Sequence, residues 1–120
     1  IHLQKDEWKL DDNYFTSEDG RRYHGRETVF YKGKPYWFIA YSGFVNDLTD
    51  PGIVYTFLKK AMLKPIKNFP VRGPKAYNEN EWKYNMHIPS CNLNEFTAEE
   101  TIKNYNKEVY KAYFIGGLIN

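Results

Sequence analysis

Residues 23–45 read YHGRETVFYKGKPYWFIAYSGFV, and residues 96–118 follow the same pattern without a gap as FTAEETIKNYNKEVYKAYFIGGL. The identical pairs are Glu27 with Glu100, Thr28 with Thr101, Lys34 with Lys107 and Gly43 with Gly116. Upstream, Glu7-Trp8-Lys9 recurs as Glu81-Trp82-Lys83, one residue out of register with the rest. Self-similarity of this kind indicates an internal duplication, in which each half opens with a strand and closes with a hairpin.

The hairpins are indicated by turn residues between runs of β-branched and aromatic side chains. Gly33 and Asn106 stand where the turns need a positive φ, which glycine and asparagine adopt most readily. Both alternating faces of residues 36–41 are apolar, so we expect a central strand covered on both sides by a helix or a partner chain. The equivalent strand, residues 109–115, carries Lys111, and we expect it nearer the sheet edge.

One amphipathic helix is predicted between the two halves. Asp50 can cap it and Pro51 suits its first position, while Pro65 ends it. Its apolar face consists of Val54, Phe57, Leu58, Ala61 and Met62. The sequence therefore predicts an α+β fold, an internally duplicated βββ-α-βββ arrangement with a mostly antiparallel sheet and the helix packed on one face. We expect a single domain over residues 1–120, with repeat halves at 6–45 and 80–119, a helix at 51–64 and a loop at 65–79.

Composition narrows the classes of function. The net charge of +2 is too small to imply a nucleic-acid partner, although basic and aromatic residues alternate between Lys59 and Tyr77. No run of about 20 apolar residues is present, so we expect no membrane partner. Cys91 is the only cysteine, which excludes an intrachain disulfide and favours a cytoplasmic protein. His24, His87 and Cys91 fit no zinc-binding spacing, so neither a metal nor a cofactor is predicted.

Four segments together resemble a bacterial family of uncharacterised domains, whose members occur alone or behind a helix-turn-helix domain in transcriptional regulators. The segments are Gly25–Trp37, Tyr41-Ser42-Gly43, Val71-Arg72-Gly73-Pro74 and Val109–Ile119. Their residues are turn and core residues, so the resemblance is specific for fold and carries little chemistry. It implies a regulatory or ligand-sensing role. The chain has no helix-turn-helix of its own, which leaves direct DNA binding in doubt.

Three residues are candidates for polar chemistry. Arg72 precedes a Gly-Pro turn, and its guanidinium suits a carboxylate or phosphate, either of a ligand or of one of the fifteen acidic residues. Glu27 and Glu100 occupy equivalent positions, which a twofold arrangement could bring together as an acid and base pair. The structural alternative is that each glutamate recurs to accept hydrogen bonds from a neighbouring turn or strand.

Aromatic residues are abundant, and equivalent ones are predicted on the helix side of the sheet. Trp37, Tyr41, Tyr110 and Phe114 would form the core there, or a ligand-binding wall where the helix leaves the sheet open. Outward-facing Tyr36 and Phe38 could instead form the surface of a homodimer.

Two functional hypotheses are favoured over a third, a nucleic-acid binder, which would require one continuous basic face formed by Lys59, Lys60, Lys64, Lys67 and Lys75. The first is a non-catalytic ligand-sensing or protein-interaction module, with Arg72 as the polar anchor of a small anionic or aromatic ligand. The second is a small enzyme acting on an anionic metabolite with Arg72 and a glutamate. The enzyme hypothesis requires Glu27 or Glu100 to lie in a cleft near Arg72 with a raised pKa.

Overall fold

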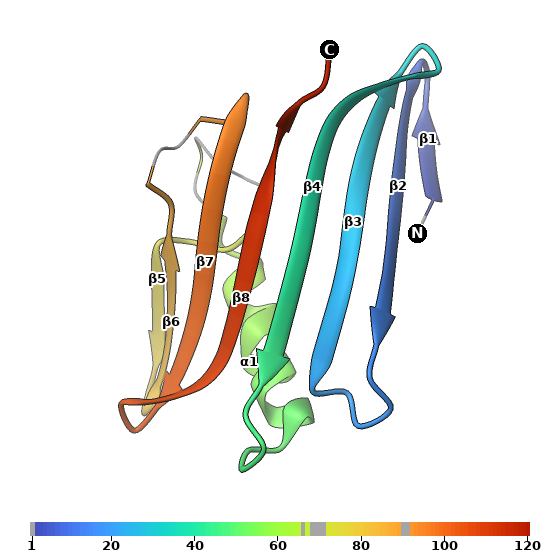
Figure 1. Ribbon diagram of the computed structural model, residues 1–120. Coiled ribbons are helices and arrows are strands. Elements are labelled where there is room, and N and C mark those ends of the chain that lie inside the picture. Colours follow the sequence, from blue (N-terminus) through green and yellow to red (C-terminus); the bar gives the residue numbers. More distant parts are fainter. Residues whose placement is uncertain (1, 66, 68–71, 90–91) are drawn as a thin grey trace.

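Eight strands form one antiparallel sheet, with a single helix on one face, in the described part of the chain (Figure 1). The computed structural model describes residues 2–65, 67, 72–89 and 92–120. Its elements are β1 (His2–Lys5), β2 (Trp8–Thr16), β3 (Arg22–Tyr31), β4 (Lys34–Val45), α1 (Pro51–Met62), β5 (Ala76–Glu79), β6 (Trp82–His87), β7 (Glu95–Asn104) and β8 (Lys107–Leu118). The strand order is β1-β2-β3-β4-β8-β7-β6-β5. No helix among the described residues is long and apolar enough to span a membrane.

The two halves meet at β4 and β8. Each half is a meander of four strands, and Tyr41 on β4 lies opposite Phe114 on β8, its equivalent in the aligned stretches. Pairing shifts by one residue after Val29 in one half and after Ile102 in the other, which are again equivalent positions. The α+β fold and the mostly antiparallel sheet are as predicted, whereas the duplication itself stays a prediction.

The predicted order βββ-α-βββ is wrong in the number of strands. β1 lies ahead of the predicted half 6–45, and β5 falls inside the predicted loop 65–79. β1 is an edge strand of four residues whose side chains are all exposed, and β5 is an equally short edge strand on the opposite side, so neither shows a hydrophobic alternation. The helix also ends at Met62, two residues earlier than predicted.

β8 is a central strand, so the expectation that it lies near an edge is wrong. Lys111 points away from α1, on the face of the sheet that carries Tyr113, and its Nζ atom is 4.0 Å from Glu99. A central strand can carry a charge where one of its faces meets solvent. β4 is central as predicted, but only one of its faces is next to α1, and Phe44 on the other face is 44% exposed.

Turn and cap residues act as the sequence indicates. Gly33 and Asn106 have positive φ values of 79° and 65° in the two equivalent hairpin turns. Asp50 caps α1, because its Oδ2 atom accepts a hydrogen bond of 3.1 Å from the backbone N–H of Ile53. Pro51 is the first helical residue.

α1 covers the sheet unevenly. Its buried residues, Val54, Phe57, Leu58 and Ala61, face a core built from β4, β6, β7 and β8. No residue of β2 or β3 is buried. Figure 1 shows α1 behind β8 and β4, with no helix behind β1 and β2. The helix therefore leaves a partly open space above the first half of the sheet.

Gly43 makes room for an aromatic ring that borders this space. It lies opposite Tyr23, and a Cβ atom at position 43 would come within 2.4 Å of the Tyr23 ring. The ring cannot easily shift, because it is in contact with Tyr41, Tyr55 and Tyr110. A glycine on β4 thus fixes the position of a tyrosine on β3.

Gly43→Ala should lower the free energy of unfolding by about 1–3 kcal/mol, because the added methyl group overpacks this tyrosine cluster. Urea unfolding followed by tryptophan fluorescence measures the change. Tyr23→Leu in the Gly43→Ala background removes the clashing ring, so the double variant should lose less than the sum of the single losses. Equal stability of Gly43→Ala and the unmodified protein would contradict the proposed contact.

Candidate functional site

A cleft of about 440 Å³ opens between α1 and strands β2, β3 and β4. Its lining includes four tyrosines, Tyr14, Tyr23, Tyr41 and Tyr55, with Asp12, Glu27, Lys59, Arg72 and Phe114. The volume falls within the range of roughly 300–1,000 Å³ that is typical of small-molecule sites. Aromatic walls with a few polar groups are also typical of such sites.

Glu100 lies directly beside the cleft, at the centre of a polar cluster, and has no exposed surface. Arg72 donates two hydrogen bonds to its carboxylate, from Nε at 3.0 Å and from Nη2 at 2.8 Å. The hydroxyls of Tyr84 and Tyr110 donate to it as well, at 2.6 and 3.2 Å. Four donors therefore satisfy both oxygens of a buried carboxylate, which would otherwise be very costly to bury.

The cluster keeps Arg72 charged and its tyrosines protonated. Burial opposes the positive charge, but Glu100 outweighs burial and raises the pKa of Arg72 above its ordinary value. Burial, followed by the charge of Glu100, raises the pKa of Tyr84 and that of Tyr110. The hydroxyls of Tyr23 and Tyr110 also share a short hydrogen bond, and burial raises the pKa of Tyr23 to about 12.

The position of Arg72 depends on Gly73, whose backbone packs closely against Met62 and Tyr84. The Gly73 backbone hydrogen-bonds the Tyr84 hydroxyl, and a Cβ atom at Gly73 would lie 2.8 Å from Met62 and 2.9 Å from that hydroxyl oxygen. The Arg-Gly-Pro turn thus docks on Tyr84 and directs the guanidinium toward Glu100. Val71, which precedes it, lies outside the described residues.

Glu27, the equivalent of Glu100, has a different environment. Its carboxylate makes no hydrogen bond or ion pair with the described residues, and it lines the cleft half-buried. Asp12 on β2 lies directly opposite it on the same face of the sheet. Burial and, next, the charge of Asp12 raise the pKa of Glu27, and Arg72 offsets part of this increase. Two facing carboxylates are unfavourable for folding, so their presence points to a function.

The structure brings together part of the predicted site. Arg72, Tyr41, Phe114 and Glu27 all line the cleft. The guanidinium lies over the Phe114 ring, 4.9 Å from its centre. Glu100 is engaged by Arg72 in an ion pair. Of the two glutamates, Glu27 is therefore the one that fits the enzyme hypothesis, because it lies in the cleft with Arg72 and its pKa is raised.

Other predicted residues lie elsewhere. Tyr110 is buried beneath the cleft, where its hydroxyl donates a hydrogen bond to Glu100. Trp37 stacks on Phe96, and its indole N–H donates to the Leu93 carbonyl. Tyr36 packs edge-on against Trp8 and is 37% exposed, while Phe38 is partly buried. The roles of these residues in binding or dimerisation stay predictions. Cys91, weighed as a metal ligand, lies outside the described residues.

Asp12, Tyr14 and Tyr55 were missed by sequence reasoning. Asp12 faces Glu27 only because of the pairing register between β2 and β3. If residues 17–21 are taken as the loop of a hairpin, pairing the residues on either side of it step by step leads to this register. Tyr55 lies on α1 next to the predicted apolar face, and its hydroxyl donates to the Gly20 carbonyl at 2.7 Å, which ties the helix to that loop.

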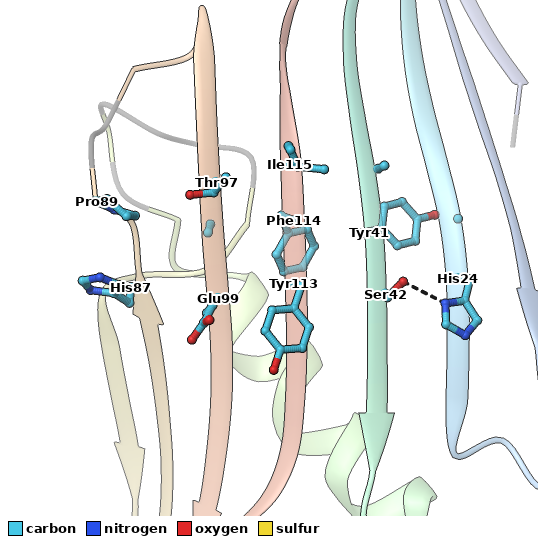
Figure 2. A pocket seen from close by; sticks show the side chains of 13 residues that line it. His24, Tyr41, Ser42, His87, Pro89, Thr97, Glu99, Tyr113, Phe114 and Ile115 are labelled. Atoms are coloured by element: carbon cyan, nitrogen blue, oxygen red, sulfur yellow. Dashed lines mark hydrogen bonds between the residues drawn. The ribbon is translucent and has the colours of Figure 1, made fainter.

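A second hollow of about 520 Å³ lies on the opposite face of the sheet (Figure 2). A row of polar side chains crosses five strands there in register: His24, Ser42, Tyr113, Glu99 and His87. Nδ1 of His24 is 2.7 Å from Oγ of Ser42, the geometry of a base and a nucleophile. However, β4 pairs on both sides, so its backbone amides are used in the sheet and do not offer an oxyanion hole. Within the described residues, the backbone of β4 therefore provides no such donor beside Ser42.

The comparisons with known proteins identify the family. A family model described as Domain of unknown function (DUF5680) matches residues 12–119. The chain belongs to the DUF5680 family. No curated protein and no solved structure was found to match it. The DUF5680 match begins within β2 and therefore leaves out β1, and it covers α1, the other six strands and the residues that line the cleft.

Removing Arg72 from the DUF5680 domain should destabilise it strongly. Arg72→Met leaves the buried carboxylate of Glu100 without its counter-charge, which should cost about 3–5 kcal/mol in urea unfolding. Arg72→Met combined with Glu100→Gln should recover most of this loss, because the neutral amide needs no counter-charge. A loss below about 1 kcal/mol in the single variant would show that the ion pair does not hold this region together.

Glu27→Gln should stabilise the domain at pH 7 by up to about 1 kcal/mol, because it removes one of two facing charges. The folded-state pKa of Glu27 is raised, so its ionised form costs stability once pH rises above the unfolded pKa. The gain should therefore be full at neutral pH and disappear below about pH 4, where Glu27 is protonated in both states.

Thermal unfolding from pH 4 to pH 8 measures this gain. Glu99→Gln on the opposite face is the matched control, since it removes the same charge from an exposed site, and it should show a smaller effect. Lower stability of Glu27→Gln at pH 7 would contradict the unfavourable environment of Glu27.

Proposed function

We propose that this domain is a non-catalytic ligand-sensing module that binds a small molecule in the cleft between α1 and β2–β4. The cleft itself is the observation that supports the proposal most directly. It joins a suitable volume with aromatic walls and a small set of polar groups that converge from separate elements. Tyr41 comes from β4, Glu27 from β3, and Lys59 from α1.

The wall of the cleft is well ordered for binding. Tyr41 donates a short hydrogen bond to Asp12, and Tyr55 is held by the Gly20 carbonyl. Arg72 is fixed by two hydrogen bonds to Glu100. Side chains that are already held in place lose little conformational entropy when a ligand binds, which favours affinity.

A sensing role also agrees with where the cleft lies. A ligand there would contact both the helix and the uncovered half of the sheet, so it could alter how the helix is held. Three further expectations are part of this proposal. The internal duplication is supported by the similarity of residues 23–45 and 96–118, and the bacterial origin and the link to helix-turn-helix regulators are supported by the family resemblance. A cytoplasmic location belongs to it as well, because the single cysteine excludes an intrachain disulfide.

A small enzyme is the second candidate, and one observation favours it. Glu27 has the raised pKa and the missing hydrogen-bond partners, within the described residues, that suit a general acid or base. Arg72 would then orient an anionic substrate with Nη1, because Nε and Nη2 are occupied by Glu100. We also retain the proposal of a homodimer through the sheet face that carries Tyr36 and Phe38, on which Phe44 and Ile115 are 44% and 59% exposed.

Native mass spectrometry of the purified protein, mixed with the small-molecule fraction of a cell extract, tests the proposal. We expect an added mass that is released on denaturation. Thr16→Trp fills the mouth of the cleft and should abolish the added mass, whereas Thr97→Trp on the opposite face should not. The same spectra give the oligomeric state.

Three outcomes separate the candidates. The bare mass under all conditions would contradict ligand binding. Loss of the added mass in Thr97→Trp alone would move the site to the opposite face. A released molecule that differs in mass between the unmodified protein and Glu27→Gln would favour the enzyme over the sensor.

A further inference from the structure

Three of the four tyrosines that line the cleft, Tyr23, Tyr41 and Tyr55, already use their hydroxyl protons within the protein. Tyr110 donates its single proton to Glu100, so the proton in the hydrogen bond between Tyr23 and Tyr110 must come from Tyr23. Tyr41 donates to Asp12, and Tyr55 donates to a backbone carbonyl. These tyrosines therefore offer ring surfaces to a ligand and no free hydroxyl protons.

Glu27 is a carboxylate of the cleft lining to which no described residue donates a hydrogen bond. It is half-buried in the cleft, without a hydrogen bond or ion pair to any described residue. An ionised carboxylate accepts hydrogen bonds and offers none. A ligand that satisfies Glu27 must therefore donate hydrogen bonds, and a charged donor does so most strongly.

The charges around the cleft also favour a cation. The positive charge of Arg72 acts on Glu27, but its two hydrogen bonds to Glu100 place a negative charge directly against the guanidinium. Lys59 also lines the cleft, but it does so from an exposed position on α1, across from β2 and β3, where solvent screens its charge. Asp12, opposite Glu27, adds a second negative charge on the same face. The floor of the cleft over β2 and β3 is therefore negative.

Aromatic rings complete the environment of a cation. Tyr14, Tyr23, Tyr41, Tyr55 and Phe114 all line the cleft. The face of an aromatic ring carries partial negative charge, so it attracts a cation held within about 6 Å of its centre. Carboxylates surrounded by aromatic rings thus recognise a positively charged nitrogen through two independent interactions.

We propose that the ligand of this cleft is a small organic cation, an amine whose charged nitrogen binds against Glu27 and Asp12 and whose apolar body packs on the tyrosine rings. The inference rests on the proposed small-molecule function and specifies its ligand class. It differs from the anionic ligand that Arg72 alone would suggest, because Glu100 already fulfils the role of an anion for that side chain.

Three probes of similar shape test the sign of the charge: phenethylamine as the cation, 2-phenylethanol as the neutral form and phenylacetate as the anion. Titration of ¹⁵N-labelled protein at pH 7.5, followed by amide chemical shifts, gives the affinity and the site of each probe. We expect the amine to shift amides of β2, β3 and α1 and to bind at least about tenfold more tightly than the alcohol or the acid.

Variants assign the charge preference to its residue. Glu27→Gln keeps the shape of the side chain, and it should remove the tenfold preference for the amine. Glu99→Gln makes the same change in net charge on the opposite face and should leave that preference intact. Thermal unfolding of both variants verifies that they are folded.

The result distinguishes this inference from the proposed function. Binding of the alcohol or the acid in the cleft as tightly as the amine would overturn the cationic ligand and leave the small-molecule site in place. A preference for the amine that survives in Glu27→Gln would overturn the assigned residue. If no probe shifts the cleft amides, the cationic ligand is overturned, and the native mass spectra then decide the proposed function by themselves.

Discussion

The ion pair between Arg72 and the fully buried Glu100 is the interaction on which the rest of the structure depends. A carboxylate without solvent must have its charge balanced and its oxygens bonded. Tyr84 on β6 and Tyr110 on β8 donate hydrogen bonds to this carboxylate. Arg72 donates as well, which fixes the Arg-Gly-Pro turn against the sheet. The same cluster therefore joins the second meander to the segment that follows the helix, and it holds Arg72 in the lining of the cleft.

The two halves use one glutamate in opposite ways. In the second half, Glu100 on β7 lies opposite the apolar Met86 on β6 and is satisfied by its donors. In the first half, Glu27 on β3 lies opposite the charged Asp12 on β2. Tyr84 on β6 donates a hydrogen bond to Glu100. The corresponding position on β2 is Leu10, whose side chain has no hydrogen-bond donor for Glu27. A glutamate without such donors, set against a second carboxylate, is unfavourable for folding. This difference between two aligned positions is the reason for proposing a site in the first half.

Local chemistry in the sequence was sufficient for the helix, the turns and the fold class, because Asp50, Pro51, Gly33 and Asn106 act through their immediate neighbours. β1 was missed because all its side chains are exposed, so it has no alternating pattern to detect. Arg72, Glu27 and Tyr41 could be named as candidates, but their partners could not, since a partner is fixed by strand register and by the path of the chain after α1. Asp12 depends wholly on that register.

The uneven cover of the sheet explains why a cleft can exist in so small a domain. One helix of twelve residues is enough to bury the core of the second half but not the face of β2 and β3. An apolar face left open in this way would favour aggregation. Here its central positions are Asp12 and Glu27, with tyrosine rings around them. These charges reduce the apolar area that the open face presents to solvent. The partial cover of α1 lowers the local dielectric, which would strengthen the interaction between these carboxylates and the proposed ligand. The helix that buries the core of one half therefore also forms, at its edge, one side of the cleft in the other.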